Sequence, residues 1–358
     1  SERLIEFHRQ MAAGGVGMTT VAYLAVSPEG RTDRHCVLLN DDSVPELRRL
    51  TEAVHGEGAA VAAQIGHAGP VANARSNRAS ALSPSGGMTP MGSRLRAIDA
   101  AGIDRVTDDY RRAAQRAVAA GFDSIEVHVG HNYLLSAFLS PKLNRRDDDF
   151  GGSVQNRARF ARQVLRAVRQ GAGSGVAVTA KLNMVDGVPK GLELDDSLEV
   201  ASLFESDGAL DAIELTGGSS LANPMYLFRG EAPLKEFGAT LPGPVRLGFK
   251  VIGRRFLRSY PFEEAYFLPQ ARQFRAALSM PLILLGGITE LETITSALAE
   301  GFDFVAMARA LLREPDLIGR MQAGDATSSL CIHCNKCMPT IYSGTRCVIV
   351  TGETSPGR

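Results

Sequence analysis

Short apolar runs alternate with amphipathic segments along most of the chain. The sequence predicts seven strands, at residues 16–26, 59–65, 125–129, 176–182, 211–215, 281–285 and 303–307. Between them, apolar positions recur every three to four residues, which predicts helices at 45–54, 107–120, 154–170, 196–205, 268–278 and 290–300. We expect Thr107 to cap the second of these helices and Gly121 to end it.

This alternation indicates a parallel sheet covered by helices, because several of the predicted strands are apolar on both faces. We predict an α/β fold, a (β/α)8 TIM barrel over residues 1–326. The chain begins on a predicted helix, so the barrel's first strand is expected upstream of Ser1. A doubly wound open sheet is the alternative. It needs no eighth strand, but no Gly-x-Gly-x-x-Gly follows a predicted strand.

Two long stretches lack periodicity. Residues 68–104 are dominated by Ser, Asn, Arg, Gly and Pro, and residues 219–265 by Pro, Gly and aromatic residues. Long loops in compact domains are usually functional or mobile. We expect the first stretch to be a loop and the second to form an irregular lid.

Charge and composition exclude several classes of protein. Lysine plus arginine equals aspartate plus glutamate, 39 against 39, so nothing indicates a nucleic-acid or membrane-surface partner. No apolar run reaches the roughly 20 residues that span a bilayer, and no signal segment opens the chain. Five cysteines are too few for a disulfide scaffold of 358 residues. We expect a protein of the reducing cytoplasm that acts on a small molecule, and a homo-oligomer is compatible with this surface.

The densest candidate chemistry follows the strand at 125–129. His128 ends that strand, and His131 and Tyr133 lie in the loop after it. In a parallel barrel such loops build the active site. Taken alone, each of these side chains is better explained by packing in the core, but the presence of all three on one loop favours a catalytic site.

Other strand ends carry further candidates. Gln64 and Lys181 should both point into the barrel's mouth, where an amide can pair with the edge of a planar heterocycle. Lys181 can lie beside a group that becomes anionic on reduction, or form a salt bridge to a loop carboxylate.

A phosphate site is predicted after the last two strands. Gly286-Gly287 follows one strand, and Ala308-Arg309 follows Met307 at the end of the other, each just before a helix. Helix N-termini and glycines accommodate phosphate, and Arg309 adds a cation. The alternative is that the glycines only make tight turns.

Residues 327–358 form a cysteine-rich segment. Cys331, Cys334 and Cys337 follow the spacing Cys-x-x-Cys-x-x-Cys, and Cys347 comes nine residues later. Four such thiols can hold an iron–sulfur cluster or a tetrahedral zinc ion. Free thiols and a redox pair remain alternatives.

The chain resembles the Old Yellow Enzyme family of flavin reductases (NADH:flavin oxidoreductases) from about Ser1 to Asp316. The stretches that carry the resemblance are GGVGMTTVAYLAVSPEGR, QIGHAG, IEVHVGHNYLLSAFLSPKLNRRDDDFGGSVQNRARF and LLGGITE to MARALLREPDL. The family implies an FMN-bearing barrel that takes hydride from NADH or NADPH. The cysteine segment is similar to the branch of 2,4-dienoyl-CoA reductase and trimethylamine dehydrogenase, which implies a [4Fe–4S] cluster.

The resemblance also implies roles for single residues. His128 and His131 match the pair that binds the oxygen of an activated alkene, and Tyr133 matches the proton donor. Gln64 matches a flavin-edge ligand. Lys181 stands where the family usually has arginine beside flavin N1, which keeps the charge but loses the planar fork. Gly287 and Arg309 match phosphate ligands, and Tyr23 replaces a small residue near the flavin.

The expected reaction is therefore reduction of a carbonyl- or nitro-conjugated C=C bond. Amine or thioester-type chemistry on the same flavin barrel is an alternative. A metal-dependent hydrolase would use His128 and His131 as ligands, with a carboxylate or a third histidine such as His67. A lyase would use Lys181 as a Schiff-base nucleophile. A cysteine-clamped binding scaffold is the alternative outside enzymes.

Overall fold

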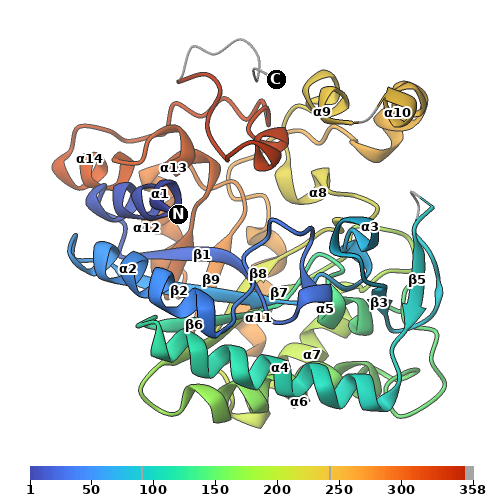
Figure 1. Cartoon of the computed structure of the whole chain (residues 1–358). Helices are drawn as coiled ribbons and strands as arrows, with labels where there is room; N and C mark the ends of the chain where they lie inside the picture. Colours follow the sequence, from blue (N-terminus) through green and yellow to red (C-terminus); the bar gives the residue numbers. More distant parts are fainter. Residues whose placement is uncertain (90–91, 242, 351–358) are drawn as a thin grey trace.

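The protein folds around one curled parallel sheet (Figure 1). A computed structural model describes residues 1–89, 92–241 and 243–350. The strands, in their order across the sheet, are β1 (Met18–Ala25), β2 (Ala60–Gly66), β6 (Ser124–Val129), β7 (Ala177–Asn183), β8 (Ala212–Thr216), β9 (Leu282–Leu285) and β10 (Phe304–Ala306). Each strand pairs with the next one along the chain, so the order never reverses as it does in a doubly wound sheet. The prediction of a parallel barrel is confirmed.

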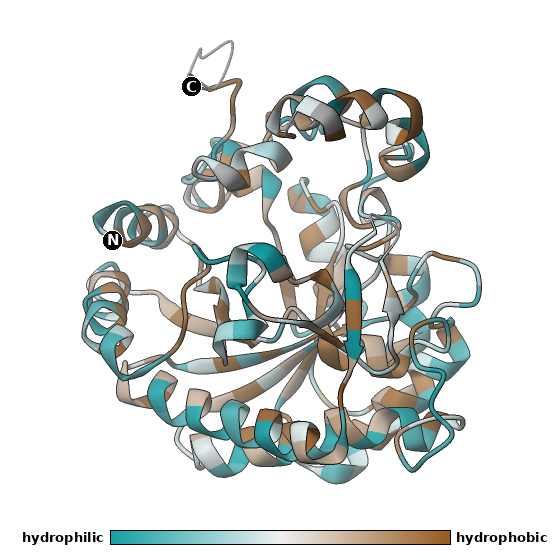
Figure 2. Ribbon diagram, turned by 45° about the vertical axis from the view of Figure 1, so that its right-hand side comes forward, coloured by the Kyte–Doolittle hydropathy of each residue, from teal (hydrophilic) through white to brown (hydrophobic). Residues whose placement is uncertain are grey.

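Helices cover the outside of the sheet. They are α1 (Glu2–Ala13), α2 (Val44–His55), α4 (Ala100–Ala119), α6 (Val154–Ala172), α7 (Leu194–Asp207), α11 (Leu268–Ala277), α12 (Leu291–Ala299), α13 (Arg309–Arg313) and α14 (Leu317–Ala323). Figure 2 shows apolar strands at the centre and polar outer faces on the helices. The buried core runs from the strands into the inner faces of α4 and α6, through side chains such as Tyr110 and Phe160.

The barrel has a seam between β1 and β10. Among the described residues, the outer edge of β1 makes one bridge, between Ala25 and Leu38, and β10 pairs only with β9. Helices span the seam instead, since the Gly319 amide donates to the Gly14 carbonyl over 2.9 Å. A side chain at Gly14 would lie 1.8 Å from the Pro315 carbonyl oxygen, so α1 and α14 pack with almost no space between their backbones. The nearly unpaired edges of β1 and β10 are expected for a barrel that lacks one strand. The position of that strand stays a prediction.

The stretch before α4 is more structured than expected. It contains α3 (Ala74–Asn77) and a small sheet of β3 (Ala81–Ser83), β5 (Arg94–Ala97) and β4 (Gly87–Met88). The predicted start of the next helix at Thr107 is wrong. Asp99 is the cap, and its carboxylate accepts from the Gly102 amide over 2.8 Å. Thr107 lies inside α4 and bonds the Ile103 carbonyl.

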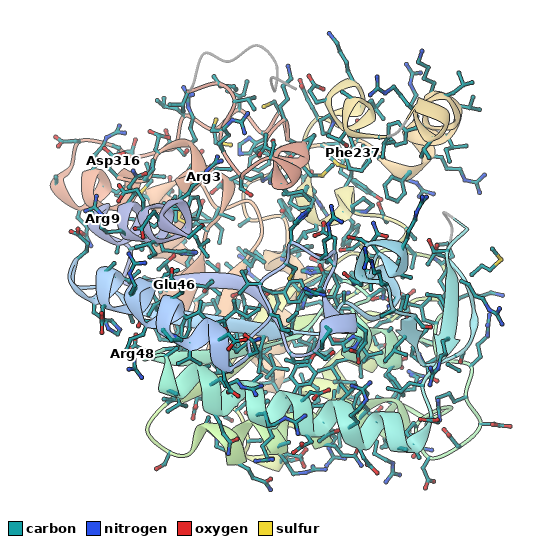
Figure 3. The ribbon with its side chains drawn as sticks, viewed as in Figure 1. Arg3, Arg9, Glu46, Arg48, Phe237 and Asp316 are labelled. Atoms are coloured by element: carbon teal, nitrogen blue, oxygen red, sulfur yellow. The ribbon has the colours of Figure 1, made fainter. Side chains whose placement is uncertain are left out.

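The predicted irregular lid is also wrong in part, because it contains α8 (Met225–Phe228), α9 (Leu234–Thr240) and α10 (Gly243–Phe256). Phe237 of α9 is labelled in Figure 3. Its ring centroid lies 5.4 Å from that of Phe249 and 6.3 Å from that of Phe256, both in α10. This aromatic cluster holds α9 and α10 together beyond α8 (Figure 1). None of the described helices is long and apolar enough to cross a bilayer.

Candidate active site

Four polar side chains from adjacent strands meet inside the barrel. Strand register places Gln64 beside Glu126, and Lys181 beside Glu214. The Gln64 amide donates to Glu126 Oε1 over 2.6 Å. Lys181 Nζ lies 3.3 Å from Glu126 Oε1 and 2.7 Å from Glu214 Oε1. The salt bridge considered for Lys181 is therefore present, but its partners come from neighbouring strands rather than from a loop.

Burial controls the charges of this group. Burial raises the pKa of Glu214 to about 8, with a further contribution from the charge of Glu126. Burial also opposes ionisation of Glu126, but Lys181 and the hydrogen bonds outweigh it and lower the pKa of that carboxyl. Lys181 is buried too, and the two carboxylates raise its pKa. At neutral pH the group thus holds one ammonium, one carboxylate and one carboxyl that keeps its proton.

The proton on Glu214 predicts a pH dependence of stability. The unfolded chain releases it above the usual pKa of 4.5, whereas the folded protein keeps it to about pH 8. The free energy of unfolding should therefore fall as the pH rises from about 5 to 8. In Glu214→Gln this part of the decline should vanish in urea unfolding of the flavin-free protein. The exposed control Glu263→Gln should keep it, and an unchanged slope in Glu214→Gln would show that Glu214 carries no proton.

A chain of hydrogen bonds fixes the two histidines. The Gly130 amide donates to His128 Nδ1 over 3.1 Å, so the ring proton of a neutral His128 is on Nε2. His128 Nε2 lies 3.3 Å from His131 Nδ1, and His131 Nε2 lies 3.0 Å from Thr216 Oγ1. Each N–H must then point along the chain, from His128 to His131 to Thr216. No acceptor of the Thr216 hydroxyl proton is found in the described part of the chain, so that proton is available to a ligand.

Both imidazoles are neutral at physiological pH. Burial lowers the pKa of His131 to about 3, and the charge of Lys181 acts in the same direction. Burial also holds the pKa of His128 well below its usual value, and His131 and Lys181 add to the effect. The pair therefore offers N–H groups as hydrogen-bond donors rather than a positive charge.

The hydrogen-bonded histidines are supported by Asn183, Asp186 and Thr216, which the sequence analysis did not single out. His131 has a φ of 59°, and its amide donates to Asn183 Oδ1 over 3.0 Å. Asn183 in turn donates to the buried Asp186 carboxylate over 2.9 Å. Asn183 and Thr216 are paired at the ends of β7 and β8. The signal that indicated Gln64 and Lys181, a polar residue ending a strand, applies equally to these two.

Substitution of Thr216 tests whether its hydroxyl takes part in acceptor reduction. Thr216→Val keeps the shape but removes both the acceptor of the His131 N–H and the hydroxyl proton that is available to a ligand, and we expect acceptor reduction to be slower by about 10²–10³. Thr216→Ser should restore most of the rate because the hydroxyl returns. The measurement is the acceptor half-reaction at several pH values. Equal rates in the valine and serine variants would mean that packing, not the hydroxyl, matters here.

Tyr133 stacks beside the histidine pair. Its ring centroid lies 4.5 Å from that of His128 and 5.4 Å from that of Tyr23. Tyr23 donates from its hydroxyl to the Gly30 carbonyl over 2.8 Å, and burial raises its pKa. The structure thus brings His128, His131 and Tyr133 together as predicted, and the proton-donor role of Tyr133 stays a prediction.

The predicted phosphate ligands lie near Tyr266. Gly286 and Gly287 have φ values of 121° and 72°, and a Cβ on Gly287 would lie 2.5 Å from the Tyr266 ring. Arg309 begins α13 just after Met307 and Ala308, and its charge acts on the Tyr266 hydroxyl. Its guanidinium donates to the Phe228 and Arg229 carbonyls over 2.7 and 2.9 Å and to Asn335 Oδ1 over 2.5 Å. The cation is therefore near the glycines but already bound to protein oxygens.

The four cysteines are neighbours without forming a metal shell. The charges of Cys334 and Cys347 influence the thiol of Cys331, whose pKa burial raises. Burial raises the pKa of the Cys337 thiol to about 11. In residues 1–89, 92–241 and 243–350, no group of three or more His, Cys, Asp or Glu side chains is arranged to hold a metal ion. An iron–sulfur cluster or zinc ion at these cysteines stays a prediction, and a hydrolase metal site at the histidines is not assembled.

The strand-end residues fit a flavin. Gln64 supplies an amide, Lys181 a buried cation, and Gly286-Gly287 a backbone that only glycine allows at such close approach to Tyr266 and Phe267. A parallel barrel with these groups at the carboxyl ends of its strands fits the class of flavin-dependent oxidoreductases.

Comparison with known proteins gives the family. Residues 1–213 match the model of the NADH:flavin oxidoreductase / NADH oxidase family. The 4,4'-dithiodibutanoate disulfide reductase of Rhodococcus erythropolis is 59% identical over 98% of this chain and 87% of its own length. The chain belongs to the NADH:flavin oxidoreductase family, of the Old Yellow Enzyme type, whose members depend on a flavin and NAD(P)H.

More distant relatives share the barrel. The multifunctional alkene reductase/demethylase OYE of Caballeronia cordobensis is 29% identical over 89% of this chain and 43% of its own length. A solved structure of 2-naphthoyl-CoA reductase superposes with a TM-score of 0.77, at 22% identity, over 94% of this chain and 49% of that one; this likeness concerns the fold alone. The chain spans about half the length of several such relatives.

Proposed function

We propose that this protein uses FMN and NAD(P)H to reduce a small organic disulfide. The observation that carries the proposal is the chain of donors from His128 to Thr216, beside the buried Lys181. The similarity to the Rhodococcus disulfide reductase supports the choice of acceptor. The reaction balances as NAD(P)H, one proton and one disulfide giving NAD(P)+ and two thiols.

The chain's own residues would act on the charge that develops on the acceptor. FMN, when bound, supplies the two electrons. Gln64, Lys181 and the glycine pair would hold it, with Lys181 stabilising negative charge on the reduced ring. The Thr216 hydroxyl, supported by His131 and His128, would donate to the atom that becomes anionic. Tyr133 or water would supply the proton.

An activated alkene is the second candidate acceptor. The resemblance to the Old Yellow Enzymes implies that the neutral His128 and His131 bind a carbonyl or nitro oxygen, in which case their N–H groups would turn to the substrate from the bonds that they make to His131 and Thr216. The alkene reductase from Caballeronia supports this candidate. Both acceptors would accumulate negative charge beside the same group of His128, His131 and Thr216, so one site can serve either reaction.

The test is a direct comparison of acceptors under anaerobic conditions. The purified protein, with FMN added, is first examined for flavin bands in its visible spectrum. It is then reduced with NADH or NADPH and mixed with 4,4'-dithiodibutanoate or cyclohex-2-enone. We expect reoxidation by the disulfide to be faster. Faster reoxidation by the enone would select the second candidate, and protein that binds no FMN would contradict both.

A further inference from the structure

Arg229 lies above the barrel's mouth among three tyrosines. It directly follows α8, which lies between the sheet and the lid helices α9 and α10 (Figure 1). Its guanidinium carbon is 5.3 Å from the ring centroid of Tyr226, 6.0 Å from Tyr260 and 4.8 Å from Tyr266. The aromatic rings hold the cation by their negative faces and remove it partly from water.

This cation has no anionic partner among the residues that the structure describes. None of the ion pairs among the described residues includes Arg229, and its Nε is buried without a hydrogen-bond acceptor. The side chain is half-buried, so the hydration that its Nε loses is not replaced by a carboxylate. Its planar fork of donors matches a carboxylate or a phosphate. The unpaired Nε therefore points to a ligand that is an oxyanion.

A second arginine adds positive potential at the same place. Arg309 donates to the carbonyl oxygen of Arg229 and likewise makes no ion pair among the described residues. The charges of both arginines act on the hydroxyl of Tyr266, whose pKa burial raises. The nearby Glu264 is already bound to Thr289, through the amide and the hydroxyl. Among the described residues, no acid forms an ion pair with either guanidinium, although the charge of Glu193 acts on Tyr226.

The position of Arg229 connects it to the candidate active site. The Tyr226 ring lies against Gly187, in the loop after β7, where an added Cβ would be 2.7 Å away. The Cβ atom of Tyr226 packs near Gly218, in the loop after β8. Lys181 lies on β7 and Thr216 ends β8, so the same two strands carry the donors and support the aromatic cluster around Arg229.

We propose that Arg229, reinforced by Arg309, forms an oxyanion-binding subsite that takes a carboxylate of the acceptor. The inference rests on the proposed function, because a dithiodibutanoate carries a carboxylate at each end. One carboxylate held at Arg229 would place the disulfide toward the donors at the strand ends. The phosphate of FMN offers the same oxyanion chemistry, and the experiment separates these two sources.

The test compares Arg229→Gln, which removes the charge, with Arg229→Lys, which keeps it, and with the exposed control Arg258→Gln. If a carboxylate binds there, Arg229→Gln raises KM for 4,4'-dithiodibutanoate about 10- to 100-fold and leaves the dimethyl ester unchanged. If the phosphate of FMN binds there, the Kd of FMN rises instead and that of riboflavin does not. The first result supports the subsite, and the second overturns it, because the arginine would then belong to the phosphate site of the cofactor. Arg229→Lys should recover part of the affinity.

A binding measurement keeps the test independent of disulfide reduction. Butanoate and inorganic phosphate are titrated into the FMN-loaded and FMN-free protein and followed by calorimetry. The wild type and Arg258→Gln should bind one of these anions, and Arg229→Gln should bind it at least tenfold more weakly. Identical anion, FMN and disulfide binding in all variants would overturn the subsite. Anion binding lost in Arg229→Gln, in a protein that reduces no disulfide, would overturn only the proposed acceptor.

Discussion

Replacing His131 with alanine should slow electron transfer from the reduced enzyme to its acceptor by about 10²–10³, the usual cost of losing one preorganised donor. The imidazole bonds His128 on one side and Thr216 on the other, over 3.3 and 3.0 Å. Its removal interrupts the chain and leaves both neighbours without a partner in a buried site. Reduction of the enzyme by NAD(P)H should change far less, because this step does not use the acceptor's donors.

Stopped-flow measurement of the two half-reactions separates these effects. His131→Asn, which retains one side-chain donor, should recover part of the acceptor rate. His35→Ala is the matched control, since the His35 side chain is 78% exposed. The proposed role is wrong if acceptor reduction is unchanged in His131→Ala. A parallel loss in both half-reactions would instead indicate damage to flavin binding.

Lys181→Met should destabilise the fold by about 3–5 kcal/mol, the range found when one partner of a buried ion pair is removed. Lys181 lies within 3.3 Å of Glu126 and 2.7 Å of Glu214, so its loss leaves two buried carboxyl groups together. Flavin affinity should fall as well if the ammonium faces the reduced ring. Urea unfolding and FMN titration measure the two effects.

A combined variant separates stability from cofactor binding. Lys181→Met together with Glu126→Gln and Glu214→Gln removes the carboxylates that the lysine balances, and stability should return to near the wild type. FMN affinity should stay low, because the cation is still missing. Lys190→Met, at an exposed position, is the control. Recovery of FMN binding in the triple variant would show that Lys181 only balances the glutamates.

The strands could be predicted because each is a short, buried apolar run between turns. The predicted strand 281–285 differs from β9 (Leu282–Leu285) by one residue. The lid helices were harder to predict from the sequence. Glycines recur in α10 at Gly243, Gly248 and Gly253 and interrupt its apolar periodicity. Asp99 was missed as a cap because the polar stretch before it contains no periodic signal.

The site was predicted where single strand ends carry unusual residues, as at His128 and Lys181. The partners of Lys181 were not predicted, because its contacts with Glu126 and Glu214 depend on the register of three strands. Arg229 gave no signal in the sequence at all. Its surroundings combine the end of a four-residue helix with Tyr260 and Tyr266, about 30 to 40 positions further along the chain.

The seam between β1 and β10 bears on which parts of the barrel open first. Backbone amides on the unpaired edges, near Met18 and the 57% exposed Phe304, should exchange with deuterium early. Those of β6 and β7, paired on both sides, should exchange late. His128 and Lys181 lie on these late-exchanging strands, so fluctuations at the seam would leave the histidine and lysine positions undisturbed.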